Sequence, residues 1–117
     1  MIKVLAIDNP RALDLIASNL EGPDFSGIPK EITYQEKHNH SNRLPLDYQF
    51  YLLHTSLVGI KDIKHLRESL PSAFIFLRNT LYPHSRFEGL GNICNKWYDF
   101  ALIKKRFIEY LSQGSRQ

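Results

Sequence analysis

The chain has a single cysteine and no long apolar segment, and both scarcities exclude whole classes of protein. Cys94 has no second cysteine to pair with, so a fold held by internal disulfides is excluded and a reducing compartment fits. No apolar run approaches the ~18 residues that a membrane-spanning helix requires. The N-terminus lacks a basic segment followed by an apolar run. We therefore expect no secretory signal, no membrane association and a cytoplasmic location.

The composition is that of an ordinary globular domain. The 117 residues are 43% apolar and 23% charged, which is enough to bury a core, and we expect one domain over residues 1–117. The formal net charge is +3, and part of the basic excess lies late in the chain, at Lys104, Lys105 and Arg106. These charges fit a solvated helix face, so we expect no nucleic-acid partner.

Strand and helix patterns alternate along the chain. Apolar or alternating segments predict strands at residues 2–7, 31–37, 48–54, 72–77 and 92–96. Apolar positions at helical spacing predict helices at residues 10–20 and 60–70, and a last helix from the cap residue Asp99 to about Gly114. This rhythm indicates an α/β fold with a parallel sheet in the flavodoxin-like order 2-1-3-4-5 and helices on both faces.

Four predicted strand ends carry polar motifs that resemble those of response-regulator receiver domains. Asp8, Asn9 and Pro10 follow the first strand, and His54 ends the third. The other two motifs are residues 76–79, around Arg78, and residues 95–99, around Lys96. The resemblance covers nearly the whole chain. It implies two-component signalling in bacteria, and a receiver whose second and fourth helices are shortened or missing, since residues 38–47 and 80–91 are broken by Pro and Gly.

The resemblance also implies that the phosphorylation site is degenerate. Asp8 takes the place of the second acid of the family's acidic pair, and Ile7 replaces the first. His54 replaces the phosphoaccepting Asp, and Arg78 stands where the family has Thr or Ser. Lys96 is kept. Further departures are Val58 for the usual Pro, Ile93 for the switch aromatic and Trp97 for the Pro after the Lys.

These departures remove the chemistry of phosphoryl transfer. An active receiver needs clustered carboxylates for a hard cation and one carboxylate as nucleophile. We expect the site at Asp8, His54, Arg78 and Lys96 to repel Mg²⁺, and Asp8 to pair with Arg78 or Lys96 instead. The hypothesis is a pseudo-receiver without metal, cofactor or enzymatic activity, which acts as a phosphorylation-independent signalling adaptor.

Such an adaptor works by binding, and the start of the last helix is the expected place. Trp97 and Tyr98 are aromatic residues beside the face through which receivers meet partners, and aromatic anchors are common at interfaces. Lys104 and Lys105 could form a polar rim. The partner would be a signalling or regulatory protein, or a second copy of the chain.

Several alternatives stay open at the level of sequence. The chain could be the receiver-like part of a DNA-binding transcriptional regulator. It could also be a small hydrolase or transferase that holds an anion with His54, Arg78 and Lys96. Weaker signals are a metal site at His38 and His40 and a nucleophilic Cys94 beside His54.

Overall fold

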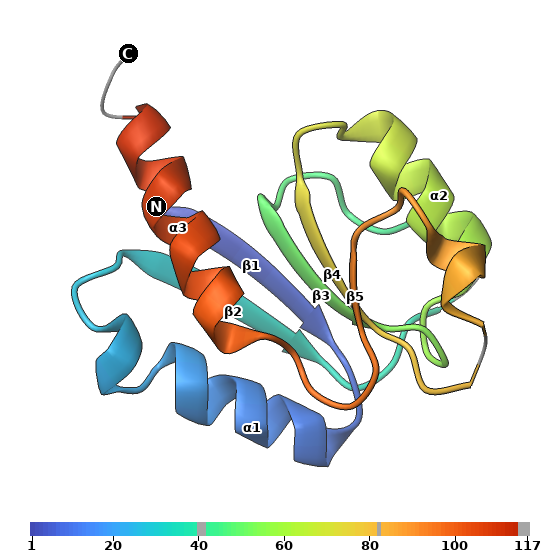
Figure 1. Cartoon of the computed structure of the whole chain (residues 1–117), viewed down its shortest axis with the longest axis horizontal. Helices are drawn as coiled ribbons and strands as arrows, with labels where there is room; N and C mark the ends of the chain where they lie inside the picture. The colour runs from blue at the N-terminus through green and yellow to red at the C-terminus, as the bar shows by residue number, and fades with distance from the viewer. Residues whose placement is uncertain (40–41, 82, 115–117) are drawn as a thin grey trace.

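A central parallel sheet organises the chain (Figure 1). The structure is a computed structural model and describes residues 1–39, 42–81 and 83–114. The strands are β1 (Ile2–Ile7), β2 (Lys30–Gln35), β3 (Phe50–His54), β4 (Phe74–Arg78) and β5 (Asn92–Cys94). The helices are α1 (Pro10–Leu20), α2 (Ile60–Ser69) and α3 (Phe100–Gly114), with short 3₁₀ turns η1 (Pro23–Phe25) and η2 (His84–Phe87). The strand order is β2-β1-β3-β4-β5, which confirms the predicted order.

Two of the connections between strands show no α-helix in their described residues. In the described residues between β2 and β3 no helix is found, and η2 is the helical element between β4 and β5. Pro45 interrupts the first connection, and Pro83, Gly89 and Gly91 interrupt the second. Proline cannot donate a helical backbone hydrogen bond, and glycine has low helix propensity. The prediction that these helices are shortened or missing is confirmed.

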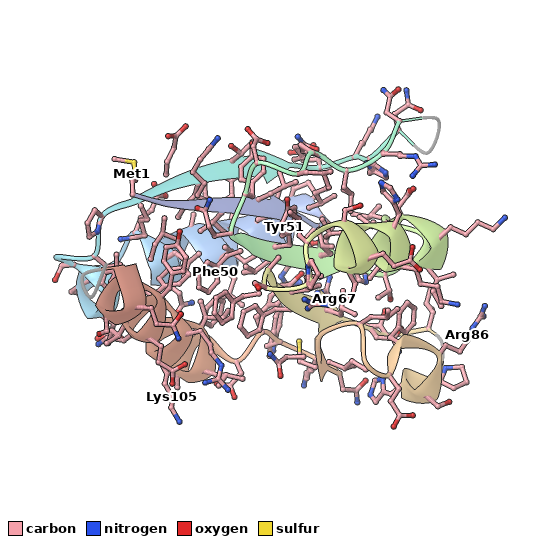
Figure 2. All side chains as sticks on the ribbon, turned by 90° about the horizontal axis from the view of Figure 1, so that it is seen from above. Met1, Phe50, Tyr51, Arg67, Arg86 and Lys105 are labelled. Atoms are coloured by element: carbon pink, nitrogen blue, oxygen red, sulfur yellow. The ribbon has the colours of Figure 1, made fainter. Side chains whose placement is uncertain are left out.

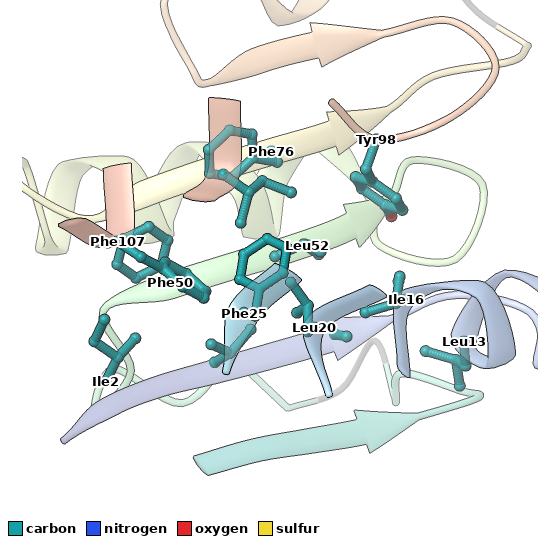
Figure 3. Packing of buried hydrophobic residues seen from close by; sticks show 13 residues of the cluster. Ile2, Leu13, Ile16, Leu20, Phe25, Phe50, Leu52, Phe76, Tyr98 and Phe107 are labelled. Atoms are coloured by element: carbon teal, nitrogen blue, oxygen red, sulfur yellow. The ribbon is translucent and has the colours of Figure 1, made fainter. Parts of the chain in front are cut away.

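The sheet separates two hydrophobic clusters, one on each face. Figure 1 shows the helices that cover these faces, and Figure 2 adds the side chains. Alternate residues of a strand point to opposite faces, so Phe50 joins the cluster under α1 and α3, and Tyr51 joins the cluster under α2. In the first cluster the Phe107 ring of α3 meets the Phe50 ring edge-on, with centroids 4.4 Å apart, and Phe25 packs on Phe107 (Figure 3). Helices therefore cover both faces, as predicted.

Local capping fixes where two helices begin. Asn9 Oδ1 accepts a hydrogen bond from the Ala12 N–H at 2.9 Å, with Pro10 at the first helical position of α1. Asp99 Oδ1 accepts one from the Leu102 N–H at 3.1 Å at the start of α3. Both caps lie just beyond the carboxyl edge of the sheet, so they also hold the turns that carry the candidate site.

Strand boundaries differ from the predicted ones by a few residues. The largest consequence is at β5, which has three residues, Asn92–Cys94, where residues 92–96 were predicted. Lys96 and Trp97 therefore lie in the turn that leads into α3. β2 lies at a sheet edge, as its alternating pattern predicted.

Candidate functional site

The candidate site lies at the carboxyl edge of the sheet, where the ends of three strands meet. Asp8 follows β1, His54 ends β3 and Arg78 ends β4. His54 and Arg78 are direct neighbours in the pairing of β3 with β4. Tyr98 comes from the turn before α3 and points its hydroxyl at the same place (Figure 3).

Asp8 is completely buried, and both of its carboxylate oxygens accept hydrogen bonds. Arg78 donates twice, from Nη2 to Oδ1 at 2.6 Å and from Nε to Oδ2 at 2.9 Å. The Tyr98 hydroxyl donates to Oδ2 at 2.8 Å, and the Asn9 N–H donates to Oδ1 at 2.7 Å. The predicted pairing of Asp8 with Arg78 is confirmed, in the bidentate geometry that gives the strongest contacts of this kind.

The Asp8–Arg78 pair is ionised. Burial alone would raise the pKa of Asp8, but the hydrogen bonds from Arg78, His54, Asn9 and Tyr98 outweigh it and hold that pKa well below its usual range. The hydrogen bond to Asp8 raises the pKa of Arg78 in turn. Burial and the neighbouring Asp8 charge raise the pKa of Tyr98, so its hydroxyl remains a donor. A guanidinium thus supplies the positive charge next to the buried acid.

His54 fills the space beside this pair. Its Nδ1 lies 3.2 Å from Asp8 Oδ1 and 3.3 Å from Arg78 Nη2, and its Nε2 lies 3.3 Å from Thr80 Oγ1. An imidazole at this strand end offers nitrogen where a hard cation would need oxygen ligands.

The order Asp8, His54, Ser56 invites comparison with a hydrolytic triad, but the geometry does not favour one. Ser56 Oγ lies 3.1 Å from both ring nitrogens of His54, so it is not aligned with the lone pair of either. A general base needs one nitrogen directed at the hydroxyl, and its orienting acid must be free to hold the ring. Here Arg78 already takes both oxygens of Asp8.

A second polar network, which the sequence analysis missed, lies behind the ion pair. The hydroxyl of Thr55 donates to Asn79 Oδ1 at 2.8 Å, and both residues are buried. Asn79 Nδ2 lies 2.9 Å from His84 Nδ1 of η2. The network ties β3 to the connection after β4. In the sequence, this network is indicated only by the polar residues at the ends of two predicted strands, Thr55 after His54 and Asn79 after Arg78.

Two predicted residues are placed differently from what the sequence indicated. Lys96 is exposed, and no hydrogen bond or ion pair joins it to Asp8 among the residues that the structure describes. β5 ends at Cys94, so Lys96 lies in the turn beyond the strand. Tyr98 was predicted to anchor a partner, and this needs correction: it is 4% exposed and its hydroxyl is bound to Asp8, so it belongs to the core and to the site.

The other predicted partner-binding residues lie on the surface. Trp97 is 46% exposed, Lys105 is exposed and reaches away from the molecule (Figure 2), and Lys104 is half-buried. Ile108, on the same helix as the two lysines, is 49% exposed and was not singled out from the sequence. Their role in binding stays a prediction.

The weaker chemical signals find little support. His38 Nε2 lies 3.0 Å from Asp62 Oδ2, and His40 lies outside the described residues. Within residues 1–39, 42–81 and 83–114, no group of three or more His, Cys, Asp or Glu side chains could hold a metal ion. Burial raises the pKa of the Cys94 thiol to about 11, which disfavours the thiolate needed for nucleophilic attack. No helix in the described part of the chain is both long and apolar enough to span a membrane.

Comparison with solved structures decides the fold. The chain is similar to the BeF3-activated receiver domain of DrrB, with a TM-score of 0.65 and 16% identity over 93% of this chain and 98% of that domain. It is also similar to response regulator DrrB, a Thermotoga maritima OmpR/PhoB homologue, with a TM-score of 0.63 and 12% identity. The chain has the fold of a response-regulator receiver domain. No family model and no curated protein matches the sequence.

The chain matches only part of the full-length response regulator DrrB. The similarity covers 97% of this chain but 54% of the whole response regulator. The receiver fold thus accounts for this chain nearly from end to end, and for about half of that longer protein.

Proposed function

We propose that this receiver-fold chain is a pseudo-receiver, a regulatory adaptor that binds a protein partner without being phosphorylated. The observation that carries the proposal is the buried Asp8–Arg78 pair, in which Arg78 and Tyr98 take both oxygens of the one acid that remains. A bound divalent cation would need those oxygens and would face the guanidinium at close range. The arrangement supports an inert site that a protein side chain has neutralised permanently.

The proposal excludes enzymatic phosphoryl transfer at this site. Covalent transfer needs a carboxylate nucleophile, and the strand end that would present it carries His54. Asp8 is 0% exposed and lies behind Arg78, so it is poorly placed to attack a phosphodonor. The function that remains for such a fold is recognition by its surface, in the setting of cytoplasmic bacterial signalling.

Exposed side chains next to α3 support the choice of a protein as partner. Trp97 and Ile108 are large apolar residues left 46% and 49% exposed. Lys104 and Lys105 lie on the same helix as Ile108. Apolar anchors with a charged rim are typical of protein interfaces, where the anchors supply affinity and the rim tunes association rate. A second copy of the chain would meet the same requirement.

The test is intact-mass measurement after incubation with Mg²⁺ and acetyl phosphate. We expect no added phosphoryl mass on this chain, whereas a receiver with a phosphoaccepting Asp, treated in parallel, should gain it. His54→Asp alone should also stay unmodified, because Arg78 would pair with the new carboxylate and the first acid is still missing at Ile7. Adding Ile7→Asp and Arg78→Thr should restore partial modification. A stoichiometric adduct on the wild-type chain would overturn the proposal.

A second candidate is a receiver-like domain within a longer DNA-binding regulator. The observation that favours it is the comparison with DrrB, of which the similar region is 54%. The two candidates differ in the reading frame that encodes the protein. A DNA-binding domain joined to this chain would favour the second. The receiver-like domain would then regulate that DNA-binding domain instead of a separate partner protein.

A further inference from the structure

Two hollows lie side by side next to the ion pair, on the outer side of Arg78. The smaller, about 220 Å³, is lined by Asn9, Arg11, Ala12, Arg78 and Trp97. The larger is an open groove of about 670 Å³ along α1, with Leu15 and Phe100 among its walls. Arg11 and Trp97 line both, so the hollows share a wall. Figure 1 shows why: the segment that leads into α3 passes the turn between β1 and α1.

The small hollow offers guanidinium groups with unused donors. Arg78 turns Nε and Nη2 towards Asp8, and no hydrogen bond from its Nη1 to another described residue is found. No buried side-chain nitrogen or oxygen of the described residues lacks a partner, so an unpartnered Nη1 is not fully buried. Arg78 itself lines the hollow. Arg11 is exposed and makes no ion pair within the described part of the chain. Guanidinium donors of this kind match the oxygens of a carboxylate.

The groove beside it is apolar. Trp97, Leu15 and Phe100 present ring and aliphatic surface there, and its volume lies in the range of small-molecule sites. Ligands of open α/β sheets commonly bind outside the carboxyl ends of the strands, which is where both hollows lie. Asp14 also lines the groove, away from the small hollow, and a carboxylate there would repel a second negative charge on a ligand.

We propose that the two hollows form a binding site for a small organic acid with one carboxylate on a flat apolar body. The carboxylate contacts Arg11 and the free Nη1 of Arg78, and the body packs on Trp97 and Phe100. Asp14 makes the site select monoacids over diacids. The ligand does not touch Asp8, whose oxygens are already occupied. The site therefore adjoins the degenerate phosphorylation site and shares Arg78 with it, but it does not depend on the adaptor function.

The chain provides its own reporter for this site. Trp97 is its only tryptophan, so one indole N–H signal in a ¹⁵N–¹H spectrum reports on the site directly. We would titrate ¹⁵N-labelled protein with phenylacetate at constant ionic strength and follow that signal. The probes for comparison are 2-phenylethanol, which has no charge; 1,4-phenylenediacetate, a diacid; and inorganic phosphate, which has no apolar body.

We expect a saturable shift with phenylacetate, with a dissociation constant in about the millimolar range for so small a ligand. The three comparison probes should each bind about tenfold more weakly or not at all. Arg11→Gln should weaken phenylacetate binding about tenfold, as expected for losing one charge-assisted contact. Arg106→Gln, on α3 and outside both hollows, is the matched control and should bind like wild type, with circular dichroism showing that both variants fold.

Three results would overturn the proposal. One is the absence of a saturable shift of the Trp97 signal with phenylacetate. Another is equal binding of phenylacetate and 2-phenylethanol, which would show that no carboxylate is recognised. The third is a folded Arg11→Gln variant that binds phenylacetate like wild type. Equal binding of the diacid would leave the site but remove the selective role of Asp14.

Discussion

At the scale of single residues, the centre of this protein is one buried carboxylate and the groups that hold it. A buried charge is costly unless it is paired and its remaining lone pairs are satisfied. Arg78, Tyr98, Asn9 and His54 meet that condition at Asp8. Such pairs add little stability compared with apolar packing, but removing one partner leaves an uncompensated buried charge.

Asp8→Asn is therefore expected to lower the free energy of unfolding by about 3 kcal/mol at pH 7, because it leaves the buried Arg78 guanidinium without a negatively charged partner. Folding lowers the pKa of Asp8, so the unfolded state binds more protons. The contribution of the carboxylate is complete above its unfolded pKa of about 4 and declines as the pH falls further. The stability difference between wild type and variant should thus shrink below about pH 4.

Urea unfolding of both proteins at neutral and acidic pH measures that difference. Asp24→Asn, which changes an exposed carboxylate, is the control and should stay within about 0.5 kcal/mol of wild type at pH 7. A folded Asp8→Asn variant as stable as wild type at pH 7 would show that the ion pair does not hold the site together.

Part of this site could be predicted from the sequence at residue level. Asp8 follows β1 and Arg78 ends β4, the two strands on either side of β3, and the parallel strand order brings those ends to one edge. The sequence could not choose between Arg78 and Lys96 as the partner, because the choice depends on where β5 ends. It also could not tell which of two adjacent aromatics points inward. Trp97 and Tyr98 have similar chemistry, and the course of the turn before α3 buries the second.

At the scale of elements, helix-capping residues and helix-breaking Pro and Gly residues made most of the fold predictable. Asn9 with Pro10, and Asp99, placed the starts of two helices, and Pro and Gly marked the connections that lack one. Strand ends were less well predicted, because they depend on pairing with a neighbour. The β5 strand is an example, since it pairs with β4 over three residues.

The end of α2 depends on a side chain whose role was invisible in the sequence. Arg67 donates to the carbonyl oxygens of Leu90, Pro71 and Ala73 at 3.1, 2.9 and 2.8 Å. These carbonyls belong to the turn after the helix and to the segment before β5, so Arg67 joins two connections (Figure 2). Burial lowers the pKa of Arg67, which still donates from both sides of its guanidinium.

Arg67→Ala should lower the free energy of unfolding by about 2 kcal/mol, because it leaves several carbonyl oxygens without a donor. Lys64→Ala, an exposed position on the same helix, should change it by less than about 0.5 kcal/mol. Thermal or urea unfolding followed by circular dichroism compares the two. Equal stability of the two variants would mean that water replaces the arginine at no cost.

At the scale of the whole molecule, a complete receiver-type sheet carries a surface with exposed apolar residues near α3. Truncating an aromatic hot spot typically costs about 2 kcal/mol of binding free energy, which is about thirtyfold in affinity. We expect Trp97→Ala to reduce association with the protein partner, or self-association, by about that factor while the fold persists. Tyr98→Phe, which removes the hydroxyl on Asp8 but keeps the buried ring, should leave association intact.

Co-purification and sedimentation of the variants, with circular dichroism to show folding, make this comparison. Leu46→Ala is a control, since Leu46 is 44% exposed and lies before β3, at the opposite end of the sheet from the candidate site. If the folded Trp97→Ala variant associates like wild type, the interface lies away from the turn before α3.

Arg78 is proposed to replace permanently the cation that an active receiver binds. The most direct test of this replacement is a ¹⁵N–¹H spectrum of the chain, recorded with and without Mg²⁺ and beryllofluoride, the species with which the DrrB receiver domain was activated. We predict that the backbone signals of Asn9, His54, Thr55 and Arg78 keep their positions. Saturable, Mg²⁺-dependent shifts of those four signals would show that the site still accepts a cation and a phosphoryl mimic, and that Arg78 does not replace the cation.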